Sequence, residues 1–117
     1  MLPVLRDDDD LDWAVFDGQL VVGRRSLQEP AGRRLGVDAI AGCDLILVPA
    51  LLVDHQGHRL GKGGGSYDRA LARTSALTVA LVHDDELVVA LPTEPHDVPV
   101  KAVATPANGL LHLPVKM

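Results

Sequence analysis

The residues best suited to chemistry lie together in one glycine-rich stretch, Arg59-Leu60-Gly61-Lys62-Gly63-Gly64-Gly65-Ser66-Tyr67-Asp68-Arg69. Glycine lets the backbone turn through positive φ and lets a ligand approach bare N–H groups. Successive N–H groups form an anion-binding concavity, which the two arginines and the lysine of this stretch would strengthen. Ser66 is placed to cap a helix that begins at Tyr67, so the loop would end at a helix N-terminus. The stretch therefore predicts a phosphate-binding loop.

Two general phosphate-binding motifs do not fit this stretch. A Walker loop needs four residues between its first two glycines, but three separate Gly57 from Gly61. It also needs a hydroxyl after the lysine, where Gly63 stands. A dinucleotide-binding fingerprint fits Gly61 and Gly63 but meets Ser66 at its last glycine, and no acidic ribose partner stands about 20 residues further on. If the stretch binds phosphate, it must do so as a different type of phosphate-binding loop.

Composition indicates one folded domain with an aliphatic core. The chain has 117 residues, of which 47% are apolar and 3% aromatic, and this excludes a disordered chain. Its net charge of −5 argues against a nucleic-acid partner, which needs a basic surface. Cys43 has no second cysteine to pair with, so we expect a reducing, cytoplasmic location. No apolar run approaches the length of a membrane span, so we expect no membrane partner.

Short apolar runs must form the elements that position the loop. They predict strands or apolar patches at 2–5, 13–16, 20–22, 44–48, 77–82, 102–104 and 110–113, with helix or strand at 87–91. The run 44–48 is apolar without alternation and is closed by Pro49, which is typical of a strand buried on both faces. A helix is predicted at 67–74 with Leu71 facing inward, and another is expected to end near Gly42. Residues 23–36 predict irregular structure with at most a short helix, and Asp54 to Gly57 predict a polar turn before the glycine-rich loop.

The order strand, loop, helix, strand predicts a largely parallel sheet. Ligands in such sheets lie at the carboxyl ends of the strands, and the glycine-rich loop follows the strand that ends at Val48. The acidic run Asp7 to Asp10 is predicted to be a solvated loop, because adjacent carboxylates repel one another.

A longer ordered set of residues resembles one family. Leu47-Val48-Pro49-Ala50, then Asp54 to Gly57, then Arg59-Leu60-Gly61-x-Gly-x-Gly-x-Tyr67-Asp68-Arg69 resembles 5-formyltetrahydrofolate cyclo-ligase, also called methenyltetrahydrofolate synthetase. Further matches flank this signature: Leu2-Pro3-Val4, Glu29-Pro30, Leu91-Pro92, Pro95-His96-Asp97 and Thr105-Pro106. We expect Glu29-Pro30 to be a structural corner and His96-Asp97 to be a buried hydrogen-bonded corner.

The resemblance implies an α/β fold, a three-layer sandwich with a largely parallel sheet. Residues 1–117 would form a single domain, the C-terminal part of the family's domain, because Leu2-Pro3-Val4 already matches the middle of the family's protein. The implied activity is ATP-dependent conversion of 5-formyltetrahydrofolate to 5,10-methenyltetrahydrofolate, a step of folate and one-carbon metabolism that releases ADP and phosphate. Alternatives are a catalytically impaired nucleotide- or folate-binding remnant and a purely structural domain. We expect a monomer, or a dimer if a sheet edge is exposed.

The resemblance also implies the site residues and the cofactors, ATP and Mg²⁺. Arg59 and Lys62 would be the catalytic cations on the phosphate oxygens, and Asp68 would bind magnesium. ATP would be held by Arg59, Leu60, Gly61, Lys62, Gly63, Gly64, Gly65, Ser66 and Tyr67. The part of this segment from Lys62 to Ser66 would also border the folate.

Several of these residues have a structural alternative or depart from the family's pattern. Asp68 would also stabilise the dipole of a following helix, Tyr67 would also suit core packing, and Lys62 would also suit solvent. Ser66 stands where the family usually has a second tyrosine. Lys101 stands where the family has a second acidic magnesium ligand, and a charged lysine cannot bind Mg²⁺.

Overall fold

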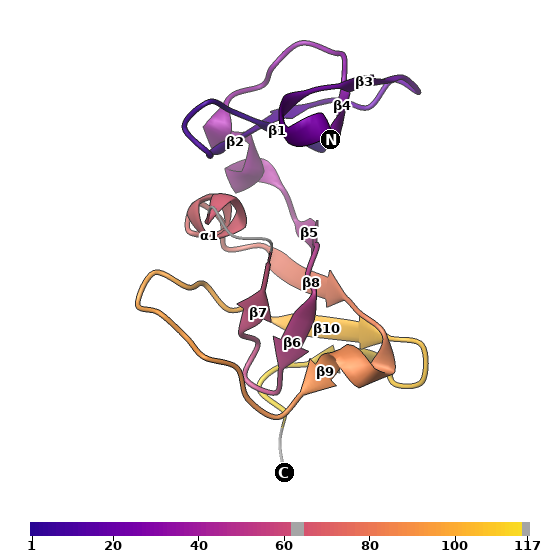
Figure 1. Cartoon of the computed structure of the whole chain (residues 1–117), viewed down its shortest axis with the longest axis vertical. Coiled ribbons are helices and arrows are strands. Elements are labelled where there is room, and N and C mark those ends of the chain that lie inside the picture. The colour runs from indigo at the N-terminus through magenta and orange to yellow at the C-terminus, as the bar shows by residue number, and fades with distance from the viewer. Residues whose placement is uncertain (62–64, 116–117) are drawn as a thin grey trace. The chain divides into compact units, whose positions relative to one another are not determined.

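A computed structural model describes residues 1–61 and 65–115 of the chain (Figure 1). The chain divides into two compact units, the first made of residues 1–43 and 64–75 and the second of residues 44–63 and 76–117. Within the described ranges, no helix is both long enough and apolar enough to cross a bilayer.

The first unit contains two β-hairpins, two 3₁₀ helices and a short α-helix. Its elements are β1 (Leu2–Leu5), β2 (Leu11–Ala14), β3 (Leu20–Val22), η1 (Arg24–Ser26), β4 (Gln28–Pro30), η2 (Val37–Gly42) and α1 (Ser66–Leu71). The strand predicted at 2–5 and the helix ending at Gly42 are confirmed, and the apolar patch at 20–22 forms strand β3. The strand predicted at 13–16 lies two residues earlier, and β4 was not predicted within 23–36.

The β1–β2 hairpin supplies most of the core of the first unit. The two strands are antiparallel, with Leu5 opposite Leu11 and Leu2 opposite Ala14. The buried apolar side chains of this unit include Val4, Leu5, Leu11, Trp13, Ala14, Pro30, Ile40, Ala70 and Leu71.

Glu29 in β4 ties the second hairpin of this unit to the first. Its residue is only 5% exposed, and its Oε2 accepts a hydrogen bond of 2.8 Å from the N–H of Leu5. A buried carboxylate needs such a donor, because loss of hydration is costly. Glu29 therefore has a structural role, but the corner predicted at Glu29-Pro30 is wrong, because both residues lie in strand β4.

The second unit is built around a mixed sheet. Its elements are β5 (Leu45–Val48), β6 (Leu52–Asp54), β7 (Arg59–Leu60), β8 (Leu77–Leu81), η3 (Asp84–Glu86), β9 (Leu87–Val88), β10 (Ala102–Thr105) and β11 (Gly109–His112). In the order β11-β10-β8-β5, the strands β10, β8 and β5 are parallel and β11 is antiparallel. A smaller sheet has the order β7-β6-β9 (Figure 1). Parallel strands in a mixed sheet confirm the α/β class.

The prediction that 44–48 is buried on both faces is wrong. Ile46 and Val48 are buried, whereas Leu45 and Leu47 are 56% and 59% exposed. In β8, Leu81 is likewise 56% exposed although Thr78, Val79 and Ala80 are buried. An uninterrupted apolar run is typical of a strand covered on both faces, but the alternating exposure along β5 shows one covered face and one open face.

Candidate functional site

Asp54 organises the β6–β7 hairpin that presents Arg59. Its Oδ1 accepts hydrogen bonds from the N–H groups of Gln56 and His58, both at 2.9 Å. Its Oδ2 lies 2.9 Å from Nδ1 of His58 and accepts a bond of 3.0 Å from the N–H of Leu91. One carboxylate therefore closes the turn and joins it to the segment after β9.

Asp54 is charged although it is 1% exposed. Burial by itself raises the pKa of this carboxyl, but the side chain of His58 and the surrounding N–H groups favour the anion. These hydrogen bonds outweigh burial, and the pKa of Asp54 lies below its ordinary value. The polar turn was predicted from its residue types, but the long-range bond to Leu91 has no local sequence signal.

Gly57 completes this turn at a position that excludes a side chain. Its φ is +96°, and a Cβ built on it would collide with the carbonyl oxygen of Val100. The Gly57 carbonyl accepts a hydrogen bond of 2.9 Å from the N–H of Val100. Only glycine satisfies both the backbone conformation and the close approach.

Arg59 lies at the carboxyl end of β5. Its Nη1 donates to the carbonyl of Pro49, the residue after this strand, at 3.2 Å. A cavity of about 550 Å³ lies at the same end of the sheet and is lined by Ala50, His83 and Thr105 among others. Crevices at the carboxyl ends of parallel strands are the usual ligand sites of α/β proteins.

The glycine-rich loop ends at α1, but the predicted serine cap is wrong. The N-cap is Gly65, in the left-handed conformation with φ 68°, and no side chain caps the helix. Ser66 is its first helical residue, and the helix ends at Leu71, earlier than predicted. Leu71 is buried, as predicted. A left-handed glycine turns the chain into the helix more readily than a serine side chain can, because it lacks a Cβ.

The structure places the predicted ligand-binding residues in two groups. Arg59, Leu60 and Gly61 lie together in the second unit, while Gly65, Ser66, Tyr67 and Asp68 lie together in the first. Arg59, Gly61 and the residues from Gly65 to Asp68 are half-buried, whereas Leu60 is exposed. Lys62, Gly63 and Gly64 lie outside the described residues. The ligand roles assigned to this segment remain predictions.

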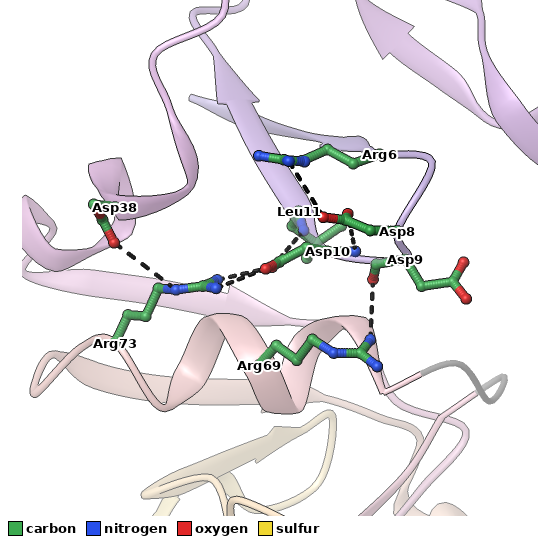
Figure 2. Close-up of polar contacts among 8 residues, drawn as sticks. All are labelled: Arg6, Asp8, Asp9, Asp10, Leu11, Asp38, Arg69 and Arg73. Atoms are coloured by element: carbon green, nitrogen blue, oxygen red, sulfur yellow. Dashed lines mark hydrogen bonds and ion pairs between the residues drawn. The ribbon is translucent and has the colours of Figure 1, made fainter.

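The prediction that Asp7 to Asp10 form a solvated loop fails at Asp10 (Figure 2). Both of its carboxylate oxygens accept bonds from Arg73, at 2.8 and 2.6 Å, and its side chain is 13% exposed. Hydrogen bonds from Arg73 hold the pKa of Asp10 at about 2, although partial burial opposes this shift. Arg73 lies 63 residues further along the chain, so the run of aspartates by itself does not predict this ion pair.

The prediction of a buried corner at His96-Asp97 is wrong for His96, which is exposed. The side chain of His96 is 62% exposed and lies 3.4 Å from the carboxylate of Glu94. Asp97 does form a hydrogen-bonded turn, because its Oδ2 accepts a bond of 2.8 Å from the N–H of Glu94. Lys101, which by resemblance stands where the family has an acidic ligand, is exposed, and its backbone N–H donates to the side chain of Thr78.

Comparison with known proteins gives a consistent assignment. The chain is 44% identical to the 5-formyltetrahydrofolate cyclo-ligase of Mycolicibacterium smegmatis over 97% of its own length and 62% of the relative's. It is 37% identical to the Escherichia coli K12 protein of that name, over 77% and 51%. The NMR structure of Aquifex aeolicus 5,10-methenyltetrahydrofolate synthetase superposes with a TM-score of 0.74 and 29% identity, covering 98% of this chain and 58% of that one. The chain thus spans between half and two thirds of the length of these relatives.

The fold and site therefore define an α/β protein with a cavity at the carboxyl ends of parallel strands. The model of the 5-formyltetrahydrofolate cyclo-ligase family matches residues 1–106. The chain belongs to that family.

Proposed function

We propose that this chain converts 5-formyltetrahydrofolate to 5,10-methenyltetrahydrofolate with ATP, releasing ADP and phosphate. Family membership across residues 1–106 is the observation that carries the proposal. The named activities of the relatives belong to proteins longer than this chain, so their extension to it is part of the proposal.

In this proposal the segment from Arg59 to Tyr67 binds ATP. Arg59 and Lys62 supply positive charge to the phosphate oxygens, and the backbone N–H groups of the glycines donate hydrogen bonds to them. Arg59 lies at the carboxyl end of β5, the end of the sheet at which the cavity lies, and this position supports the role. The left-handed Gly65 supports a loop that needs glycine for its path.

The proposed chemistry asks mainly for positioning and charge stabilisation. The formyl oxygen attacks the γ-phosphorus of ATP, ADP leaves, and the formyl carbon becomes an activated iminium phosphate. The N10 amine then bonds to this carbon and loses its proton, and phosphate leaves with the former formyl oxygen. Arg59 and Lys62 would stabilise the negative charge that develops on the transferred phosphoryl group.

Asp68 is the residue proposed to hold Mg²⁺. It is half-buried in the first turn of α1, and its carboxylate is a hard oxygen donor of the kind that this ion takes alongside phosphate and water. Bound there, the ion would neutralise phosphate charge. Asp68→Asn is expected to raise the Mg²⁺ concentration needed for ATP binding, measured by titration of the metal at fixed ATP.

We also propose that the two units act as one cyclo-ligase domain in the cytoplasm. The single free cysteine, Cys43, supports a reducing compartment. The chain would be a monomer, or a dimer through β5, which lies at one edge of the four-stranded sheet. Sedimentation of the purified chain over a range of concentrations distinguishes these states.

The direct test is turnover by the 117-residue chain itself. The purified chain is mixed with ATP, Mg²⁺ and 5-formyltetrahydrofolate, and the methenyl product is followed by its absorbance. The proposal predicts product that depends on ATP and is lost in Arg59→Ala. Binding of ATP or folate by the folded chain without turnover would instead support the non-catalytic remnant.

A further inference from the structure

The loop between β1 and β2 is held in one shape by its own hydrogen bonds. The N–H of Arg6 donates to the carbonyl of Asp10 at 2.9 Å, and the N–H of Asp9 donates to the carbonyl of Arg6 at 3.2 Å. Oδ1 of Asp8 accepts from the N–H of Asp10 at 3.0 Å. Asp9 has a φ of 66°, which few residues other than glycine adopt. The loop is therefore a fixed platform rather than a loose acidic run.

Two arginines from α1 and the turn after it reach this platform (Figure 2). Arg73 binds the Asp10 carboxylate through two nitrogens, at 2.8 and 2.6 Å. Arg69 donates from Nη1 to the carbonyl of Asp9 at 3.4 Å, and the same nitrogen lies 3.8 Å from the Cβ position built on Gly65. Arg69 lies in α1 and Arg73 in the turn after it, so the helix and its C-terminal turn are each joined to the loop.

The Asp10–Arg73 contact is more buried than the Asp7–Arg24 ion pair of the same loop. The two side chains are 13% and 28% exposed, whereas those of Asp7 and Arg24, which are also paired, are 91% and 52% exposed. Such a bidentate pair, called the fork below, fixes the orientation of the guanidinium to the carboxylate as well as their distance. Asp10 also accepts a bond of 2.8 Å from the N–H of Leu11, so its carboxylate is itself held.

The helix needs such an external contact. It has six residues, and its buried side chains are Ala70 and Leu71. A helix this short is unstable on its own, and its placement depends on tertiary contacts. Tyr67 and Asp68 lie in its first turn, so their direction follows that of the helix.

We propose that Asp10 and Arg73 are positioning residues for nucleotide binding: their fork fixes α1 against the β1–β2 loop and so sets the directions of Tyr67 and Asp68. This inference rests on the proposed function. It adds two residues that touch no ligand and act through the helix that follows the glycine-rich loop.

The test compares ATP affinity and helix order in matched variants of the full chain. Asp10→Asn keeps the shape of the side chain but removes its charge, and Arg73→Lys keeps the charge but removes the fork. Asp7→Asn is the control, because it removes an equivalent carboxylate from the same loop. ATP affinity is measured calorimetrically with Mg²⁺, and hydrogen exchange of the amides of residues 66–71 is measured without nucleotide. Thermal unfolding shows that each variant is folded.

The proposal predicts that Asp10→Asn weakens ATP binding about tenfold, because small misplacements of binding groups are costly. Arg73→Lys would weaken ATP binding less than Asp10→Asn does. The double variant would bind ATP no more weakly than Asp10→Asn alone. Asp7→Asn would change ATP affinity by less than about twofold. Exchange of the α1 amides would rise in the variants at Asp10 and Arg73 only.

The two arms of the experiment separate this inference from the proposed function. Unchanged ATP affinity in Asp10→Asn, or losses that simply add in the double variant, would show that the fork does not position the binding residues. Faster α1 exchange with unchanged affinity would reduce the pair to a stabilising contact and overturn the proposal. A wild-type chain that binds no ATP would overturn the proposed function, and the exchange arm would still decide whether the fork fixes the helix.

Discussion

Gly57 offers a quantitative test of how the hairpin that presents Arg59 is held. Gly57→Ala introduces two separate penalties, because the backbone has a φ of +96° and the new Cβ would collide with the carbonyl oxygen of Val100. The left-handed conformation costs an L-residue about 1–2 kcal/mol, and overpacking against a backbone atom adds about 1–3 kcal/mol. The expected loss in the free energy of unfolding is therefore about 2–5 kcal/mol.

Two other glycines separate these penalties. Gly109 has a φ of +61° but open space around its Cβ position, so Gly109→Ala should show the backbone penalty alone. Gly42 has open space and no positive φ, so Gly42→Ala should change stability by less than about 0.5 kcal/mol. The loss in the free energy of unfolding should be largest for Gly57→Ala, smaller for Gly109→Ala and smallest for Gly42→Ala.

The assay is urea unfolding followed by circular dichroism, with ATP affinity measured on the folded fraction. Gly57→Ala should also weaken ATP binding, because the turn that it distorts leads directly into Arg59. If Gly57→Ala costs no more than Gly109→Ala, the close packing of this turn against Val100 is refuted.

Three further outcomes follow from the described contacts. Arg59→Ala should weaken ATP binding about tenfold or more in the calorimeter, whereas Arg33→Ala, which removes an exposed cation elsewhere, should not. Because the pKa of Asp10 falls from the ordinary 3.8 to about 2 on folding, this group contributes about 2 kcal/mol above pH 4 that is lost as the pH falls towards 2, measurable by urea unfolding across that range. Asp54→Asn should destabilise the chain by about 1–3 kcal/mol at neutral pH, and the difference from wild type should shrink in acid, because the pKa of Asp54 is lowered in the folded chain. An equal loss at every pH would refute the charged state assigned to Asp54.

The sequence predicted the elements whose signal is local. Apolar runs located β1, β8 and β10 closely, since each run is bounded by polar or turn residues. The order of these runs also predicted parallel strands, which the pairing of β5, β8 and β10 confirms. These predictions need no knowledge of distant partners.

Two of the predictions that failed depend on contacts between distant residues. A run of four aspartates predicts a solvated loop, but Arg73 holds Asp10 across 63 residues. The apolar run of β5 is the same whether one face or both are covered, and here Leu47 remains exposed. At α1 the error was local: Gly65 and Ser66 both suit the start of a helix, and the chain uses the glycine.

The candidate site shows the same division. Residue types predicted a phosphate-binding loop and the turn before it, and family resemblance supplied the ligand. The acceptor role of Asp54 towards Leu91 could not be predicted, because that bond joins residues 37 apart. The hydrogen bonds of the Asp54 carboxylate hold the β6–β7 hairpin that carries Arg59.

The central claim is that the segment from Arg59 to Tyr67 holds the phosphates of ATP, and titration followed residue by residue tests it most directly. Amide resonances of the ¹⁵N-labelled chain are recorded as MgATP is added. The account predicts saturable shifts centred on Gly61, Gly65 and their neighbours, which Arg59→Ala abolishes. Shifts confined to other parts of the chain, or none at millimolar nucleotide, would contradict it.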